Sequence, residues 1–151
     1  YMLGLTRKAD YALVALAHMG RPEVRGKTIS ARQIADEHHL PLPLLMNILK
    51  DLVHAGIVSS TRGPQGGYVL AAPPDELSVA AVINALEGPF QLTQCCTGEV
   101  PVRDQCQVHG NCPIREPIRR LHARIRGFLD DVTLADLMDS KVDVPVVRLG
   151  V

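Results

Sequence analysis

Residues 29–71 read ISARQIADEHHLPLPLLMNILKDLVHAGIVSSTRGPQGGYVLA, and this stretch decides the fold. Ser30 with Gln33 three positions later has the form of a capping box, which predicts a helix that begins there. The helix is expected to stop before Leu40, because a proline follows that residue. His38 and its neighbour His39 are expected to lie at the surface at the end of this helix.

A second helix follows directly. Pro43 suits its first turn, where a missing backbone N–H costs nothing, and Gly56 closes it. Its apolar residues recur at helical spacing and form one buried face. They are Leu45, Ile48, Leu49 and Leu52.

Two short strands, Ile57–Thr61 and Tyr68–Leu70, come next and are joined by the turn GPQGG. Helix, tight turn, helix and hairpin in this order are typical of a winged helix-turn-helix. In that fold the last helix enters the major groove of DNA, and the hairpin tip reaches the backbone or the minor groove. We therefore expect a mainly α fold with a small β-hairpin.

Polar residues of this unit are candidates for contact with DNA. Asn suits paired hydrogen bonding to adenine, and Lys suits guanine or phosphate. The glycines of the turn allow backbone N–H groups to approach phosphate closely. The alternative for each residue taken singly is that it is an ordinary solvated surface residue. The candidates are Arg7, Lys8, Asn47, Lys50, Arg62, Gly63 and Gln65.

On either side of this unit the chain is helical. An amphipathic helix is expected from Thr6 to Met19, a short one capped by Ser78, and another that starts at Thr133. The expected domains are residues 1–73 for DNA binding, 74–138 for a short helix, a cysteine segment and a dimerisation helix, and 139–151 for a flexible tail.

Before Thr133, apolar residues repeat at spacings of four and three, which is a heptad-like pattern about two heptads long. Such a stripe on a long helix, remote from the first core, predicts a contact between two copies of the chain. The alternative is that the stripe packs back on its own chain. The stripe consists of Ile114, Ile118, Leu121, Ile125 and Phe128.

The four cysteines, Cys95, Cys96, Cys106 and Cys112, lie within eighteen residues in a segment rich in Gly, Pro and polar residues. Side chains on such a bendable segment can converge on one point, as a metal or an iron–sulfur cluster requires. Gaps of zero, nine and five residues between them count against a zinc site, which usually begins with a gap of two to four. A metal-free thiol switch that forms disulfides on oxidation is a further alternative.

The composition excludes several other classes. The formal net charge is zero, so an interaction with nucleic acid must rest on local charge placement. No apolar run reaches membrane-spanning length, so we expect no membrane partner and a cytoplasmic location. The sequence contains no glycine-rich nucleotide loop, no nucleophile elbow and no histidine pair one helical turn apart, so we do not expect an enzyme.

Several segments together resemble the Rrf2 family of bacterial transcription regulators, from about Leu5 to Leu137. They are LTRKADYALVAL, residues 29–71, LSVAAVINALEGP, the cysteine segment and VTLADL. The resemblance implies a homodimer that binds a palindromic operator in double-stranded DNA, with its long C-terminal helices crossing. It also implies a repressor that responds to nitric oxide, redox conditions or cluster status. The stretch ALEGPFQLTQC resembles the corresponding stretch in the branch of the family that regulates iron–sulfur assembly genes.

The resemblance further implies three cysteine ligands for a 2Fe–2S or 4Fe–4S cluster. Cys106 and Cys112 reproduce the gap between the last two ligands of the assembly-regulator branch. Cys95 is the expected first ligand, with Cys96 as the alternative. Where that branch has a histidine as fourth ligand, this chain has an arginine. We therefore expect Asp10 as the fourth ligand, as in the nitric-oxide-sensing branch, where the partner subunit donates an acid, with His109 as the alternative.

Overall fold

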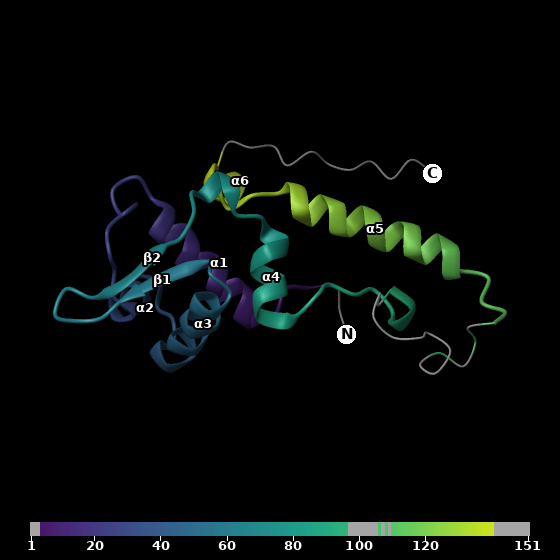
Figure 1. Cartoon of the computed structure of the whole chain (residues 1–151), viewed down its shortest axis with the longest axis horizontal. Helices are drawn as coiled ribbons and strands as arrows, with labels where there is room; N and C mark the ends of the chain where they lie inside the picture. Colours follow the sequence, from purple (N-terminus) through teal and green to yellow (C-terminus); the bar gives the residue numbers. More distant parts are fainter. Residues whose placement is uncertain (1–3, 97–105, 107, 109, 141–151) are drawn as a thin grey trace.

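The computed structural model describes residues 4–96, 106, 108 and 110–140 of the 151-residue chain (Figure 1). Over these residues the chain is mainly helical and carries one two-stranded antiparallel hairpin. None of the described helices is both long and apolar enough to cross a membrane. The elements are α1 (Arg7–Gly20), α2 (Ala31–His38), α3 (Leu42–His54), β1 (Val58–Thr61), β2 (Gly67–Leu70), the 3-10 turn η1 (Pro74–Glu76), α4 (Val79–Glu87), the 3-10 turn η2 (Gln94–Cys96), α5 (Arg115–Asp131) and α6 (Leu134–Met138).

The predicted capping box of α2 is confirmed. The hydroxyl of Ser30 accepts a hydrogen bond from the backbone N–H of Gln33 at 3.2 Å, and the Gln33 side-chain oxygen accepts one from the backbone N–H of Ser30 at 3.0 Å. Pro43 lies in the first turn of α3, and Ser78 caps α4 by accepting from the N–H of Ala81. Local sequence therefore determines where these three helices begin.

Replacing Ser30 by Ala removes the hydroxyl that accepts from the N–H of Gln33, while the backbone N–H of residue 30 can still donate to the Gln33 side chain, and should lower the free energy of unfolding by about 1 kcal/mol. Urea denaturation followed by circular dichroism would measure the change. Ser59→Ala is the matched control, because Ser59 lies exposed on β1 and caps no helix. Equal effects of the two substitutions would show that the cap does not stabilise α2.

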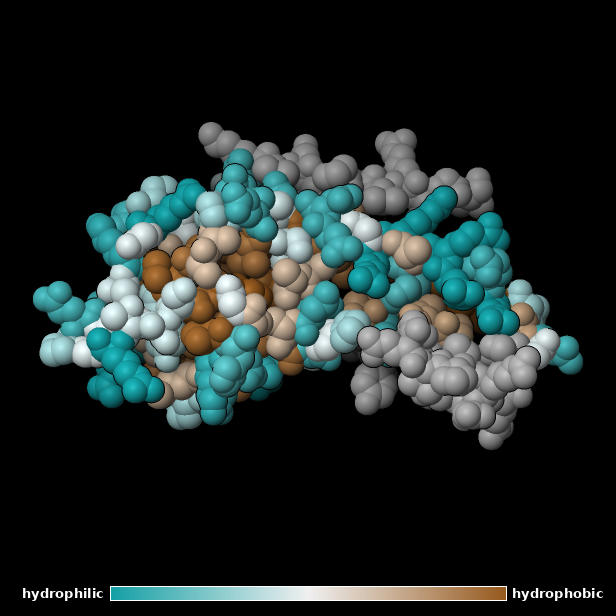
Figure 2. All heavy atoms as spheres, viewed as in Figure 1, coloured by the Kyte–Doolittle hydropathy of each residue, from teal (hydrophilic) through white to brown (hydrophobic). Residues whose placement is uncertain are grey.

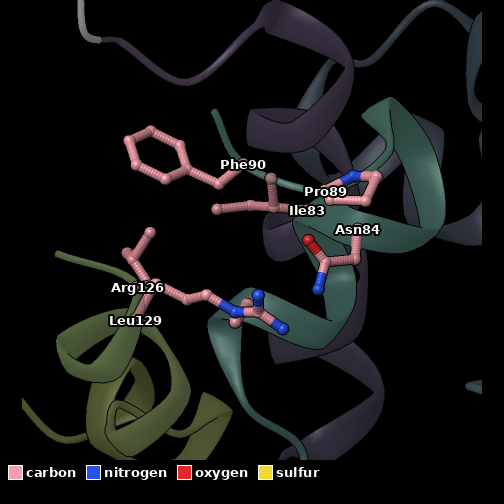
Figure 3. Close-up of a pocket in the computed structure, with 7 residues that line it drawn as sticks. Ile83, Asn84, Pro89, Phe90, Arg126 and Leu129 are labelled. Atoms are coloured by element: carbon pink, nitrogen blue, oxygen red, sulfur yellow. The ribbon is translucent and has the colours of Figure 1, made fainter. Parts of the chain in front are cut away.

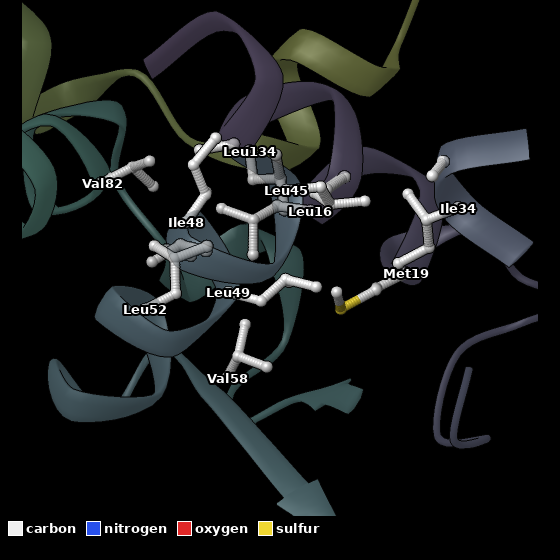
Figure 4. Packing of buried hydrophobic residues seen from close by; sticks show 14 residues of the cluster. Leu16, Met19, Ile34, Leu45, Ile48, Leu49, Leu52, Val58, Val82 and Leu134 are labelled. Atoms are coloured by element: carbon white, nitrogen blue, oxygen red, sulfur yellow. The ribbon is translucent and has the colours of Figure 1, made fainter. Parts of the chain in front are cut away.

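The core lies where α1, α2 and α3 pack together (Figure 4). It is aliphatic, as a chain without tryptophan requires, and α3 contributes its whole apolar face. Leu77, Val82 and Leu134 belong to the same core, although they come from beyond residue 73. Helices α4 and α6 are thus packed onto the helix-turn-helix. The largest fully buried side chains are Leu16, Met19, Ile34, Leu45, Ile48, Leu49, Leu52, Leu134, Val58 and Val82.

The hairpin is joined to the segment before α2. In the β1–β2 pair Val58 faces Leu70, and each strand begins one residue away from the predicted position. Ile29 pairs with Tyr68 through two backbone hydrogen bonds of 2.9 and 2.8 Å. A Cβ at Gly67 would lie 2.5 Å from the carbonyl oxygen of Ile29, so only glycine permits this close approach. The hairpin is therefore held against the helix-turn-helix.

Helix α5 projects away from the core (Figure 1). None of its 17 residues, all within the described part of the chain, is buried. The predicted apolar stripe lies along it, although Ile114 precedes the first helical residue and is 60% exposed. Leu121 is 39% exposed. Figure 2 shows apolar (brown) atoms between hydrophilic (teal) ones along the end of the molecule that α5 forms.

After α5 the chain returns to the core. The backbone N–H of Val79 donates to the carbonyl of Val132, and the N–H of Leu134 donates to the carbonyl of Leu77, both at 2.8 Å. The predicted helix at Thr133 is confirmed as α6, and a capping box with Asp136 begins it. These bonds fix the C-terminal end of α5 next to the start of α4.

Candidate DNA-binding surface and cysteine site

Helix α3 has a buried face and an opposite, exposed one. Asn47 and Lys50 are exposed on the second face, at the spacing of neighbouring turns. Met46 is 50% exposed, so its side chain does not lie in the core. His54, four residues after Lys50, is also exposed and was not among the predicted contacts. The spacing of four residues places His54 on the same face of the helix as Lys50, and this spacing could have identified it from the sequence.

The tip of the hairpin presents Arg62, Gly63 and Gln65, all exposed. Gly63 has φ 115°, a conformation that favours glycine, and a Cβ there would meet nothing within 4 Å. The carbonyl of Gln65 accepts a hydrogen bond from the Thr28 hydroxyl at 3.2 Å. The wing tip is thus open to solvent while its backbone is attached to the segment before α2.

Lys8 is engaged inside the molecule. Its ammonium lies 2.7 Å from Oδ2 of Asp51 on α3 and 3.3 Å from the carbonyl oxygen of Leu86 on α4. The hydrogen bond from Lys8 holds the pKa of the Asp51 carboxyl below its ordinary value. Lys8 therefore joins three helices, and we leave it out of the proposed DNA contacts. Arg7 is exposed at the start of α1.

The lowered pKa of Asp51 predicts a pH-dependent stability. The Lys8–Asp51 pair should contribute fully above the ordinary pKa of an aspartate, and its contribution should be lost as pH falls through the lower folded-state pKa. A double-mutant cycle of Lys8→Met and Asp51→Asn, read by urea denaturation at neutral and acidic pH, isolates the pair. A coupling energy that stays constant into strong acid would contradict the ion pair.

The cysteines lie on the segment that joins α4 to α5. Cys95 and Cys96 belong to η2, which packs against α5, and Cys112 lies just before α5. The Thr93 hydroxyl lies 3.0 Å from Sγ of Cys95 and 3.4 Å from Sγ of Cys96. Cys95, Cys96, Cys106 and Cys112 are all free thiols of intermediate exposure.

The start of the cysteine segment is attached to α5 by an aromatic contact. The rings of Phe90 and His122 stack with their centroids 5.7 Å apart and their planes 3° from parallel. Phe90 also lines a small crevice between α4 and α5, together with Asn84 and Arg126 (Figure 3). A shift of the cysteine segment would therefore change the packing between α4 and α5.

The predicted cluster ligands do not converge on one point in this structure. Among the described residues, no three cysteine, histidine or carboxylate ligand atoms at this segment lie within 4.8 Å of one another. Asp10 is exposed in the first turn of α1, and its side chain has no hydrogen bond or ion pair within the described part of the chain. The alternative ligand His109 lies outside the described residues. Free, half-exposed thiols and an unengaged carboxylate nevertheless have the donor chemistry that an iron–sulfur cluster requires.

The helices α1 to α3 and the attached hairpin define a winged helix-turn-helix protein, the class expected to place a helix in the major groove. The chain belongs to the Rrf2 family, since the family profile described as "Iron-dependent Transcriptional regulator" matches residues 5–140. The HTH-type transcriptional regulator IscR of Serratia proteamaculans is 33% identical over 143 residues, which are 95% of this chain and 83% of that protein. IscR of Aliivibrio salmonicida is also 33% identical, over 91% of this chain and 79% of that protein.

Solved structures agree with this assignment. CymR, the global cysteine regulator of B. subtilis, has a TM-score of 0.68 and 30% identity, covering 91% of this chain and 97% of that one. IscR of T. potens has a TM-score of 0.64 and 28% identity, covering 90% and 86%. The predicted family and fold are confirmed, and the chain is a DNA-binding transcription regulator rather than an enzyme.

Proposed function

We propose that this protein is an iron–sulfur-sensing repressor that binds a palindromic operator as a homodimer. The observation that carries the proposal is a set of four free, half-exposed thiols on a segment attached to α5. The thiols are partly exposed, and the helix beside them carries an apolar stripe of which no residue is buried in one copy of the chain. A sensor at this place would lie between the DNA-binding unit and the dimer contact.

The exposed face of α3 and the wing tip would contact DNA. Asn47 and Lys50 would reach base edges in the major groove, and Arg62 would bind the phosphate backbone. Arg32 adds a further candidate, because it is exposed in the first turn of α2. A cation at a helix N-terminus is disfavoured by the helix dipole, and a bound phosphate would offset that cost.

Helix α5 would form the dimer contact through its apolar stripe. A helix of 17 residues is about 26 Å long, enough to pair with a copy of itself over several turns. Two-fold symmetry would then place two α3 helices in successive major grooves, about one DNA turn apart, and so account for a palindromic operator.

Cys95, Cys106 and Cys112 would hold the cluster as thiolates, with Cys96 as the alternative first ligand. Asp10 of the second copy would supply a fourth ligand, with His109 as the alternative. The bound cluster would supply iron that reacts with nitric oxide and oxygen. A carboxylate is a harder ligand than a thiolate, so Asp10 would be the more easily displaced partner.

The coupling to DNA would run through packed elements. The cysteine segment is attached to α5, and α5 packs on α4, which in turn contacts α1 and α3. When Asp10 is bound to the partner's cysteine segment, the two DNA-binding units would be held at one spacing. A coupling free energy of about 1–3 kcal/mol would change operator affinity by one to two decades.

A metal-free thiol switch is the second candidate. It is favoured by the free, partly exposed thiols of this segment. In that case oxidation would join cysteines of this segment in a disulfide. The resulting change in the segment would reach the DNA-binding unit through α5 and α4, as proposed for the cluster.

Anaerobic purification separates the two candidates. We expect a coloured protein that contains iron and sulfide, and whose affinity for its own promoter in a gel shift changes on exposure to nitric oxide. A colourless, iron-free protein whose DNA affinity responds to peroxide would instead support the thiol switch. Salt-independent DNA binding would count against both, since phosphate contacts release counterions.

A further inference from the structure

The C-terminal ends of α1 and α2 bring two imidazoles and a carboxylate together, away from the cysteines. Nδ1 of His18 lies 2.9 Å from Nε2 of His38 and 3.6 Å from Oε2 of Glu37. One ligand atom from each of these residues lies within 4.8 Å of the other two, and no other described residues form such a group. His18 is only 3% exposed, so this is a site with a buried wall.

The spacing of these atoms suits a small divalent ion. Around a tetrahedral zinc ion with bonds of about 2.0–2.1 Å, ligand atoms lie about 3.3 Å apart. The observed separations of 2.9 and 3.6 Å fall on either side of that value. The ligand atoms of Glu37 and His38 lie within 4.8 Å of each other, and small shifts of His38 and of the half-exposed Glu37 side chain would close the site around an ion.

Neighbouring groups prepare these ligands. Arg21 donates to Oε1 of Glu37 and leaves Oε2 free, as a supporting residue often does for a metal-binding carboxylate. The positive charge of Arg21 opposes a cation, and the negative charge of Glu37 offsets it. Burial lowers the pKa of His18, which favours the neutral form of the ring, the form that has a lone pair for a metal.

One nitrogen of the buried His18 ring lacks a hydrogen-bond partner in the described part of the chain. Nε2 of His18 is buried and has no hydrogen-bond partner among the described residues. With the proton on Nε2, Nδ1 is left as a lone-pair donor that faces His38 and Glu37. A metal would bind through Nδ1, on the side of the ring that faces the other two ligands, and Nε2 would point away from it.

We propose that His18, Glu37 and His38 bind one divalent transition-metal ion of the zinc type, with water as the fourth ligand. The ion would join α1 to α2, the first helix of the helix-turn-helix. It would thus brace the DNA-binding unit independently of any cluster at the cysteines. This proposal does not depend on the function proposed above.

The test uses the full chain with Cys95, Cys96, Cys106 and Cys112 all replaced by Ser, so that thiols cannot bind the probe metal. Calorimetric titration with Zn²⁺ should give one site per chain, Co²⁺ should give the visible spectrum of a tetrahedral site, and Zn²⁺ should raise the Tm. His38→Gln and Glu37→Gln should each lower Zn²⁺ affinity at least tenfold and abolish the rise in Tm.

The matched control is His39→Asn, which removes the adjacent, exposed histidine. Asn tolerates the left-handed backbone found there, at φ 53°. This variant should bind Zn²⁺ as the cysteine-free parent does. No binding by that parent, or undiminished affinity in both His38→Gln and Glu37→Gln, would overturn the proposal. Circular dichroism would establish that each variant is folded.

Discussion

Leu121→Asp is expected to turn the protein into a monomer and to lower its affinity for a palindromic operator by two decades or more. Leu121 lies mid-way along the apolar stripe of α5 and is partly exposed in one copy of the chain. In a two-fold dimer the substitution is present in both subunits, so two carboxylates would face each other in an apolar contact. A monomer would engage only one half-site and lose the gain from binding two.

Sedimentation velocity and a gel shift would measure the two effects. Ala123→Asp is the matched control, because it introduces the same charge on the opposite, exposed side of α5. It should leave both the oligomeric state and the DNA affinity of the parent. If Leu121→Asp stayed dimeric and bound the operator as the parent does, the stripe would not be the dimer contact.

The second large effect is expected for Cys112→Ser, which should yield a protein with less than about a tenth of the parent's iron after anaerobic purification. Cluster iron requires thiolate ligands, and a serine hydroxyl does not replace one at neutral pH. Cys112 lies directly before α5, so its loss removes the ligand nearest to the dimerisation helix. Operator affinity should then no longer respond to nitric oxide.

Cys96→Ser provides the comparison, since Cys96 is a thiol of similar exposure on the same segment and lies next to Cys95 on η2. It should keep the cluster if Cys95 is the first ligand. If Cys95→Ser retained the cluster and Cys96→Ser lost it, Cys96 rather than Cys95 would be the first ligand. Full iron content and an intact nitric-oxide response in Cys112→Ser would exclude a cluster held by this segment.

The helices could be predicted because their signals are local. Ser30, Ser78 and Pro43 lie within a few residues of the backbone groups they satisfy, and all three take the predicted roles. The stripe on α5 was likewise visible as a periodicity. Its first residue, Ile114, falls outside the helix, because a periodic pattern locates a face better than a boundary.

The contacts between distant residues could not be predicted in this way. Lys8 and Asp51 are 43 positions apart, and nothing in the sequence near Lys8 indicates that its charge is engaged. The expectation that His38 lies at the surface is wrong, because the ring is half-buried against His18. Packing of α1 against α2 creates that contact, and helical periodicity says nothing about which helices meet.

For the cysteine site, the sequence predicts a set of ligand atoms but not their arrangement. Thiols on a bendable segment identify a ligand set by chemistry, and their separation depends on how the segment is folded. The fourth ligand depends on a second copy of the chain, whose orientation one sequence does not specify. Asp10 therefore stays a prediction.

The pairing of Ile29 with Tyr68 makes the position of the hairpin depend on a segment that is not among the proposed DNA contacts. Residues 21–28, between α1 and α2, set where Ile29 lies, and Thr28 is hydrogen-bonded to the wing tip. Shortening or lengthening this connection would displace the wing as a whole relative to α3. Natural variation in the length of that loop is therefore a route by which related regulators could acquire new operators without changing a single DNA-contacting side chain.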